Sequence, residues 1–196
     1  MRKTRLLIVG GGGHGRSVAE AAELSGTFDV VGFLDDALPI GQPVLRRVVL
    51  GAVANLSQLD SYRVACDQVI VAVGNNTVRE KLVKQLIDAG FDIASVIHPR
   101  AVVSPSVALG IGSAVMAGAI VGTEAQLGVG VIVNCGAVVD HHAKVGDFAH
   151  LGVSACMAGG SILGRNAWLQ AGCALGYGVE VAAGAVLTPG IALTAS

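Results

Sequence analysis

A repeat of six residues runs through the second half of this 196-residue chain and constrains its fold more than any other feature. Counted in steps of six from Ile97 to Leu193, every position is aliphatic or Met. The residue two places before each is mostly small, and the residue after it is mostly Gly or another turn-forming type. A period of six fits neither an α-helix nor a plain strand. It predicts a solenoid of short strands that each direct one large side chain inward.

Three such hexads would form one triangular coil. The repeat would then hold roughly five coils, stacked at the usual strand spacing of about 4.8 Å. The large aliphatic side chains would fill the prism, and the small residues would fit where the chain bends. The periodicity alone gives neither the handedness of the solenoid nor a distinction between a scaffold and an enzyme.

Composition argues against several functional classes. The 13 Lys and Arg nearly balance the 14 Asp and Glu, so nothing favours binding to nucleic acid. The hydrophobic fraction is 53%, yet no apolar run approaches the roughly 18 residues of a membrane span. The first apolar run is too short for a signal peptide, which predicts a cytoplasmic protein. The four cysteines are dispersed without CxxC spacing, which favours buried free thiols.

The N-terminal third alternates strand-like and helix-like segments. Apolar, strand-like runs cover residues 5–9, 29–34, 68–73 and 91–97, and helical patterns cover 17–25 and 78–89. Residues 37–52 form a loop with at most one short strand. This order favours a small parallel α/β unit. We therefore predict a Rossmann-like, nucleotide-sugar-binding domain over residues 1–95 and a β-helix over 96–196.

A glycine-rich motif, Gly10-x-Gly12-x-x-Gly15, separates the first strand from the first helix, and Asp35 follows twenty residues later. This is the layout of a dinucleotide fingerprint, in which glycines let the backbone approach a pyrophosphate at a helix N-terminus. The alternative is a glycine-rich turn that binds nothing. Because the unit is short for a complete Rossmann domain, the motif favours one nucleoside diphosphate, such as that of a sugar nucleotide, over NAD.

The most polar part of the repeat contains Asp140, His141 and His142 in succession, with His150 close behind. A neutral histidine is a suitable general base for an attacking amine or hydroxyl, and a neighbouring carboxylate such as Asp140 can fix its tautomer. The alternative is a solvated turn. Three histidines could also hold Zn²⁺, but no HxxxH or CxxC spacing supports a metal site.

Taken together, the sequence resembles the sugar O-acyltransferase and sialic acid O-acetyltransferase family. Within it, the closest resemblance is to bacterial N-acetyltransferases of nucleotide-linked 4-amino sugars, of the UDP-bacillosamine and GDP-perosamine types. The resemblance covers nearly the whole chain. The stretches that carry it are Gly-Gly-His-Gly15, Leu-Asp-Asp36, Val-Gly-Asn-Asn76 with Arg79, His98-Pro99, and Asp140-His141 through Gly159-Gly160.

The resemblance implies a left-handed parallel β-helix, three chains trimerising side by side, and acetyl-CoA in the groove between two β-helices. It implies acetyl transfer from acetyl-CoA to the amino group of a nucleotide-linked 4-amino-4,6-dideoxy sugar, for the synthesis of surface glycans. O-acetylation of a sugar such as sialic acid is a close variant, because amine and hydroxyl acceptors need the same base and thioester site.

The resemblance also assigns residues to the two substrates. In the N-terminal unit it places Gly12, Gly13, His14 and Gly15 at the phosphates and Asp35 and Asp36 at the nucleoside, with Gly74 and Asn75 nearby. In the β-helix it makes His141 the base, places His150, Gly159 and Ala171 at acetyl-CoA, and lets Asn134 orient the acceptor sugar.

Two departures from the family pattern affect this assignment. Relatives carry an acid directly after the catalytic histidine, whereas this chain has His142, so the negative charge would have to come from Asp140. Relatives also carry a further coil and tail, whereas this sequence stops at Thr194-Ala-Ser196 with the repeat still in frame and the last edge uncapped. Both departures favour a second hypothesis, a non-catalytic, trimeric nucleotide-sugar-binding scaffold. A third, an NAD-dependent oxidoreductase, rests on the glycine motif alone, and the repeat leaves no room for its second domain.

Overall fold

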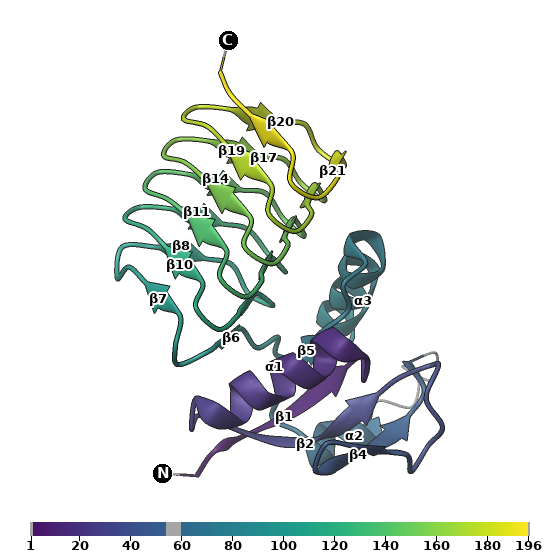
Figure 1. Cartoon of the computed structure of the whole chain (residues 1–196). Coiled ribbons are helices and arrows are strands. Elements are labelled where there is room, and N and C mark those ends of the chain that lie inside the picture. Colours follow the sequence, from purple (N-terminus) through teal and green to yellow (C-terminus); the bar gives the residue numbers. More distant parts are fainter. Residues whose placement is uncertain (1, 54–59, 196) are drawn as a thin grey trace. The chain divides into compact units, whose positions relative to one another are not determined.

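The structure, a computed structural model, describes residues 2–53 and 60–195. It divides into two compact units, Met1–Val96 and Ile97–Ser196 (Figure 1). The division lies one residue beyond the boundary expected from the sequence. The first unit is an α/β domain and the second is a parallel β-helix, as the residue patterns predicted, and its left-handed coil agrees with the family resemblance.

The first unit is built on a five-stranded sheet in the order β3-β4-β2-β1-β5. Its elements are β1 (Thr4–Val9), α1 (Gly13–Leu24), β2 (Phe28–Leu34), β3 (Pro43–Val44), β4 (Arg47–Gly51), α2 (Asp60–Ala65), β5 (Gln68–Val71) and α3 (Asn76–Asp88). Strand β1 lies between β2 and β5 and pairs with both in parallel, while β3 and β4 form an antiparallel hairpin. The apolar run of β1 from Leu6 to Val9 is buried, which explains its lack of polar alternation.

The first unit differs from the sequence prediction in three places. The loop expected over 37–52 contains two short strands rather than one. The strand expected over 91–97 is reduced to a single bridge between Val69 and Ile93, followed by β6 (Val96–Ile97), which belongs to a sheet of the β-helix. Helix α2 was not predicted. It covers only six residues, too short for apolar periodicity to be seen in sequence.

The β-helix consists of two-residue strands that form three parallel sheets (Figure 1). The first sheet contains β6, β9 (Ala114–Val115), β12 (Ile132–Val133), β15 (His150–Leu151), β18 (Trp168–Leu169) and β21 (Val186–Leu187). The second contains β7 (Val102–Val103), β10 (Ile120–Val121), β13 (Val138–Val139), β16 (Cys156–Met157), β19 (Ala174–Leu175) and β22 (Ala192–Leu193). The third contains β8 (Ala108–Leu109), β11 (Gln126–Leu127), β14 (Lys144–Val145), β17 (Ile162–Leu163) and β20 (Glu180–Val181).

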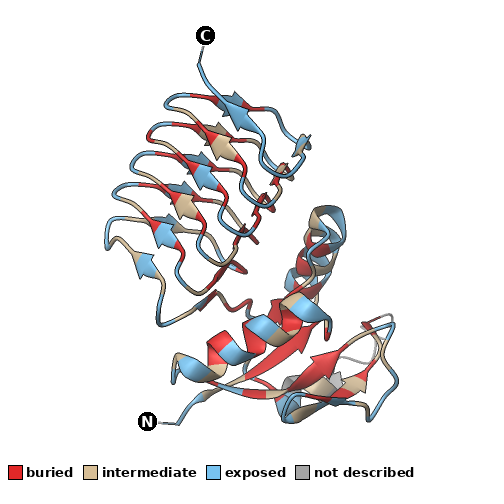
Figure 2. Ribbon diagram, in the orientation of Figure 1, coloured by how far each residue is buried: buried red, intermediate tan, exposed pale blue. Residues whose placement is uncertain are grey.

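The six-residue repeat gives the core of the β-helix directly. The second residue of each strand points inward, and from Val115 to Val181 all of these positions are buried (Figure 2). Small residues such as Ala137 and Ala143 share this core. Paired strands are offset by eighteen residues, as for Val139 and Met157. The inward side chain of one coil therefore stacks on the inward side chain of the next. Burial of each inward aliphatic side chain stabilises the folded β-helix by roughly 1.5–3 kcal/mol.

Glycine has two different roles at the corners of the coils. From Gly112 to Gly190, every sixth residue has a positive φ, and most of these residues are glycine. Glu124 and His142 are among the exceptions. The glycines directly after the inward positions serve another purpose: a Cβ on Gly128 would lie 2.7 Å from the backbone nitrogen of Asp147 in the next coil. The turn-forming residues noted in the sequence therefore allow close stacking rather than a left-handed backbone.

All four cysteines are free. The expectation that they are buried is correct for Cys66 and Cys173 only, because Cys135 is half-buried and Cys156 is exposed. Cys156 is the outward residue of β16, so the two-residue period of the strand places it on the surface.

Candidate active site

The Asp140-His141-His142 segment forms a corner of the β-helix between β13 and β14. Residues eighteen apart occupy the same corner in successive coils, so Gly159 and Tyr177 follow His141. The ring of His141 covers Gly159: a Cβ added there would overlap Cε1 and lie 2.6 Å from Nε2. The ring of Tyr177 lies beyond it, with ring centroids 6.4 Å apart. Glycine at position 159 thus leaves room for the imidazole.

His141 is held by a second imidazole. Its Nδ1 lies 3.0 Å from Nδ1 of His142, and the two rings meet edge to face. The other ring nitrogen of His142, Nε2, lies 2.9 Å from Oε2 of Glu124. Glu124 occupies the same corner one coil earlier, eighteen residues before His142. Sequence analysis missed Glu124, although the repeat predicts its position next to His142.

Asp140 contacts His141 differently from the expectation. One carboxylate oxygen accepts a hydrogen bond from the backbone N–H of His141, at 2.7 Å. The other lies 3.8 Å from Nε2, a distance at which charge acts but no hydrogen bond forms. The partner of Nδ1 of His141 is therefore His142 rather than Asp140. The contact at this nitrogen decides which tautomer His141 adopts.

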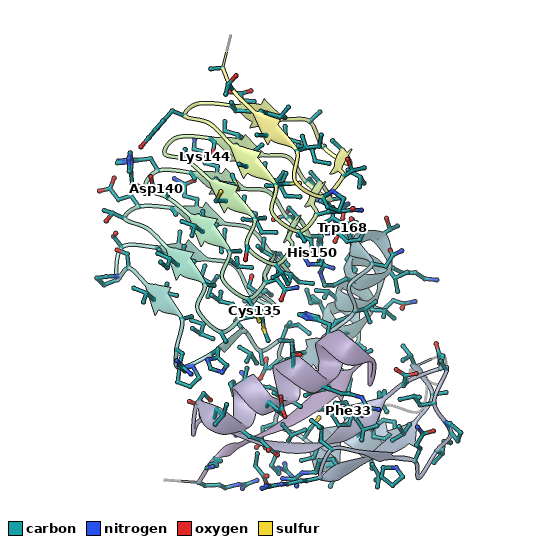
Figure 3. All side chains as sticks on the ribbon, viewed as in Figure 1. Phe33, Cys135, Asp140, Lys144, His150 and Trp168 are labelled. Atoms are coloured by element: carbon teal, nitrogen blue, oxygen red, sulfur yellow. The ribbon has the colours of Figure 1, made fainter. Side chains whose placement is uncertain are left out.

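The remaining predicted residues of the β-helix lie elsewhere on it. Asn134 and Ala171 occupy the corner that precedes the second sheet, at the opposite end of its strands from His141. His150 lies in β15 and stacks on Trp168, with ring centroids 5.4 Å apart (Figure 3). Figure 3 shows Asp140 at a different edge of the β-helix. Within one chain, the structure therefore unites His141 with Gly159 but does not bring Asn134 into the same region.

In the first unit, the glycine-rich loop connects β1 to α1. Gly10 has a φ of 106°, and a side chain on Gly15 would overlap the carbonyl of Gly10. Gly12 is the N-cap of α1 and has no side chain to cap the helix. A Cβ placed on Gly12 or Gly13 would have no other atom within 4 Å. Open space at the N-terminus of a helix suits an anionic group.

His14 follows this loop, and its Nε2 is buried without a hydrogen-bond partner among the described residues. Burial, together with the positive charge of Arg79, lowers the pKa of His14 to about 4. The buried Arg79 guanidinium donates to the carbonyls of Val73 and Gly74 and to Oδ1 of Asn76. Burial also lowers the pKa of Arg79 to about 10. His14 is thus held neutral beside a cation that shapes the loop after β5.

A cavity of about 580 Å³ lies beside the glycine-rich loop. Its walls are Gly10, Asp35, Asp36, Ala37, Val53, Val73, Val78, Lys81, Leu82 and Gln85. The carboxylate of Asp35 accepts hydrogen bonds from the backbone N–H groups of Gly11, Ala37 and Leu38. It therefore ties two loops together. Asn75 caps α3, since its Oδ1 accepts from the N–H of Val78.

Sequence analysis missed the contribution of α3 to this cavity. Lys81 and Gln85 are one helical turn apart and both line it. Their spacing is that of any exposed helix face, so the sequence held no signal for them. Among the described residues, no group of three or more His, Cys, Asp or Glu is arranged to hold a metal ion, and no helix is long and apolar enough to cross a membrane.

Comparisons with known proteins agree with this two-part architecture. The family profile of the PglD N-terminal domain matches residues 5–86. PerB from Caulobacter crescentus, solved in complex with CoA and GDP-perosamine, is 37% identical, with a TM-score of 0.82. That comparison covers 95% of this chain and 90% of PerB. This chain belongs to the bacterial nucleotide-linked amino-sugar N-acetyltransferase family.

Two further members of this N-acetyltransferase family support the assignment. The acetyltransferase domain of PglB from Neisseria gonorrhoeae, solved with acetyl coenzyme A, is 34% identical, with a TM-score of 0.79 and coverage of 99% of this chain and 97% of that domain. UDP-N-acetylbacillosamine N-acetyltransferase of Bacillus subtilis (strain 168) is 32% identical over 110 residues. This alignment spans 56% of this chain and half the length of that curated relative. The family predicted from the sequence is thus confirmed.

Proposed function

We propose that this protein transfers the acetyl group of acetyl-CoA to the amino group of a 4-amino-4,6-dideoxy sugar linked to a nucleoside diphosphate. The observation that carries this proposal is the position of the His141 imidazole, which contacts His142 through Nδ1 and fills the space beside Gly159. The complexes of PerB with CoA and GDP-perosamine and of the PglB domain with acetyl coenzyme A support it.

In the proposed reaction, His141 is the general base. The sugar amine attacks the thioester carbonyl carbon, a C–N bond forms, and Nε2 of His141 takes the N–H proton. The carbonyl oxygen becomes an oxyanion, which the backbone N–H group at Gly159 and, from a neighbouring chain of the oligomer proposed below, that at Ala171 stabilise. When the oxyanion collapses, the C–S bond breaks, and the thiolate of CoA leaves and takes up the proton. Asp140 lies close enough to Nε2 to favour the imidazolium formed on the way.

In the first unit, we assign the sugar nucleotide to the cavity beside the glycine-rich loop. The diphosphate would lie at Gly12, Gly13, His14 and Gly15, where the N-terminus of α1 offers open backbone N–H groups. Asp35 shapes the nucleoside end with its backbone hydrogen bonds, and Asp36, Lys81 and Gln85 add polar groups to the wall. Gly74 and Asn75 complete the loop after β5.

We propose that three chains assemble side by side. The outward residues of the second sheet form an apolar face, and Val102 and Ile120 on it are 63% and 44% exposed. This face ends at the His141 corner on one side and at the corner of Asn134 and Ala171 on the other. Packing neighbouring β-helices against one another would bring the two corners together from different chains, so the site would be complete only in the oligomer. Light scattering on the protein as it elutes from a size-exclusion column should give three times the mass of one chain.

We place this reaction in the cytoplasm. Acetyl-CoA and sugar nucleotides are cytoplasmic metabolites, and the four free cysteines agree with a reducing compartment.

The deciding experiment is a thiol-release assay with acetyl-CoA and a panel of UDP- and GDP-linked 4-amino sugars. Release of CoA that depends on one of these sugars, together with N-acetylated product by mass spectrometry, would support the proposal. Turnover only on hydroxyl acceptors would replace it with O-acetylation. Binding of a sugar nucleotide without any turnover would favour the non-catalytic scaffold.

A further inference from the structure

The family pattern places an acid directly after the catalytic histidine, and this chain has His142 there. A neutral imidazole carries no negative charge, so the sequence alone suggests a weakened base. The structure places a carboxylate one step further away: Oε2 of Glu124 lies 2.9 Å from Nε2 of His142, and Nδ1 of His142 lies 3.0 Å from Nδ1 of His141. The three side chains form a chain of polar contacts that ends at the proposed base.

We propose that Glu124 is a positioning residue that acts through His142 to fix the tautomer of His141. This inference rests on the proposed acetyl transfer. A carboxylate only accepts hydrogen bonds, so the single proton of neutral His142 belongs on Nε2. Nδ1 of His142 is then an acceptor, and the proton it accepts comes from Nδ1 of His141. This leaves Nε2 of His141 unprotonated, as a general base requires.

The same contacts serve the charged state of the reaction. When Nε2 of His141 takes a proton from the sugar amine, the new imidazolium still donates from Nδ1 to His142. The negative charge of Glu124 then stabilises that cation through the polarised imidazole between them. No proton needs to leave His142 in this step. Asp140 contributes from the other side of the ring, because its carboxylate lies 3.8 Å from Nε2.

The repeat explains why these residues meet. Glu124 and His142 occupy the same corner in successive coils, with φ values of 57° and 58°. The next two coils have Gly160 and Gly178 at this position, with φ values of 67° and 66°. A glycine at position 124 is therefore compatible with the backbone of the corner. Glu124 and His142 are both non-glycine residues in the left-handed region, a backbone conformation that carries a conformational cost.

The test variant is Glu124→Gly, which removes the carboxylate and keeps the backbone that later coils use. The matched control is Asn166→Gly, a residue with a φ of 58° in the corner between β17 and β18, where no site residue is assigned. We expect kcat of Glu124→Gly to fall roughly tenfold or more, in the range seen when the partner that orients a functional histidine is lost, with the KM for acetyl-CoA unchanged. The control should keep the wild-type kcat. An equal fall in both variants would assign the effect to corner flexibility and overturn the proposal.

A second variant tests the path through His142. In His142→Glu, a carboxylate directly follows His141, so Glu124 becomes dispensable. Adding Glu124→Gly to that background should change kcat by less than about twofold, a strong departure from additivity. Glu124 itself shows that this corner accepts glutamate at a positive φ. If Glu124→Gly lowers kcat by the same factor in both backgrounds, Glu124 does not act through His142.

A spectroscopic measurement separates this proposal from the proposed function. Long-range ¹H–¹⁵N NMR spectra of histidine-labelled protein, recorded where the imidazoles are neutral, report which ring nitrogen carries the proton. We expect wild-type His141 to be protonated on Nδ1 and to become a tautomer mixture in Glu124→Gly but not in Asn166→Gly. Wild-type His141 protonated on Nε2 would overturn the proposal even in an active enzyme. The expected tautomers in a protein without turnover would instead refute only the proposed function.

Discussion

The ring of His141 occupies the space that a side chain on Gly159, its counterpart one coil later, would need. A Cβ at position 159 would overlap Cε1 and lie 2.6 Å from Nε2. The corner backbone is fixed by the hydrogen bond from the N–H of Gly160 to the carbonyl of His141, at 3.0 Å. The imidazole must therefore move if residue 159 gains a side chain.

Gly159→Ala should displace the proposed base while the β-helix stays folded. Because a misplacement of about 1 Å can cost on the order of 100-fold in rate, we expect a fall of that size in kcat/KM with little change in thermal stability. The matched control is Gly160→Ala, where no atom lies within 4 Å of the added Cβ but φ is 67°. That variant should lose about 1–2 kcal/mol of stability and keep the catalytic geometry. Similar kcat/KM values for the two variants would contradict the role of Gly159.

Replacing His141 itself tests the general base. His141→Asn keeps a polar group near the position of Nδ1 but has none at Nε2 and cannot take a proton at neutral pH. We expect kcat to fall by roughly 100- to 10,000-fold, the usual contribution of a general base. The side chain is half-exposed, so the melting temperature and oligomeric mass should not change. Near-normal rates in the thiol-release assay would remove His141 from the mechanism.

The repeat made the β-helix predictable because one physical requirement, an inward aliphatic side chain, recurs in every strand. Val139 and Met157 pair in the structure as their eighteen-residue spacing implies. The contacts of the site were harder to predict because they depend on which side chains meet between coils. Glu124 and His142 meet only when three hexads close a coil, and Asp35 is engaged by backbone N–H groups that no sequence pattern displays. Lys81 was missed because cavity-lining and solvated faces of a helix have the same spacing.

The inward assignment of the repeat has a direct test in Val139→Asp. Val139 is fully buried in the prism next to the His141 corner, so an aspartate there would be an unpaired charge in an apolar core. We expect a loss of several kcal/mol or more, and hence an unfolded or aggregated β-helix. The control is Val186→Asp, at an outward position that is 56% exposed. Val139→Asp as a stable, folded β-helix in circular dichroism and thermal melts would show that residue 139 points outward.

His14 should make the stability of the first unit depend on pH. Its folded-state pKa of about 4 lies below the unfolded value of 6.5, so between these values the unfolded chain binds more protons. The free energy of unfolding should therefore fall as pH drops from about 6.5 to about 4, by at most roughly 3 kcal/mol, and level off below that range.

His14→Gln removes this titration, because its amide stays neutral throughout the range. Hydrogen exchange of β1 and α1, corrected for intrinsic rates, should give opening free energies that fall between pH 6.5 and 4.5 in the wild type. The same free energies should change much less in His14→Gln. The Arg5–Asp67 pair does not interfere, because its guanidinium lowers the pKa of Asp67 to about 2 and its stabilising effect is lost only as pH falls from about 4 towards 2. Equal pH dependence in both proteins would mean that His14 protonates as easily in the folded chain as in the unfolded one.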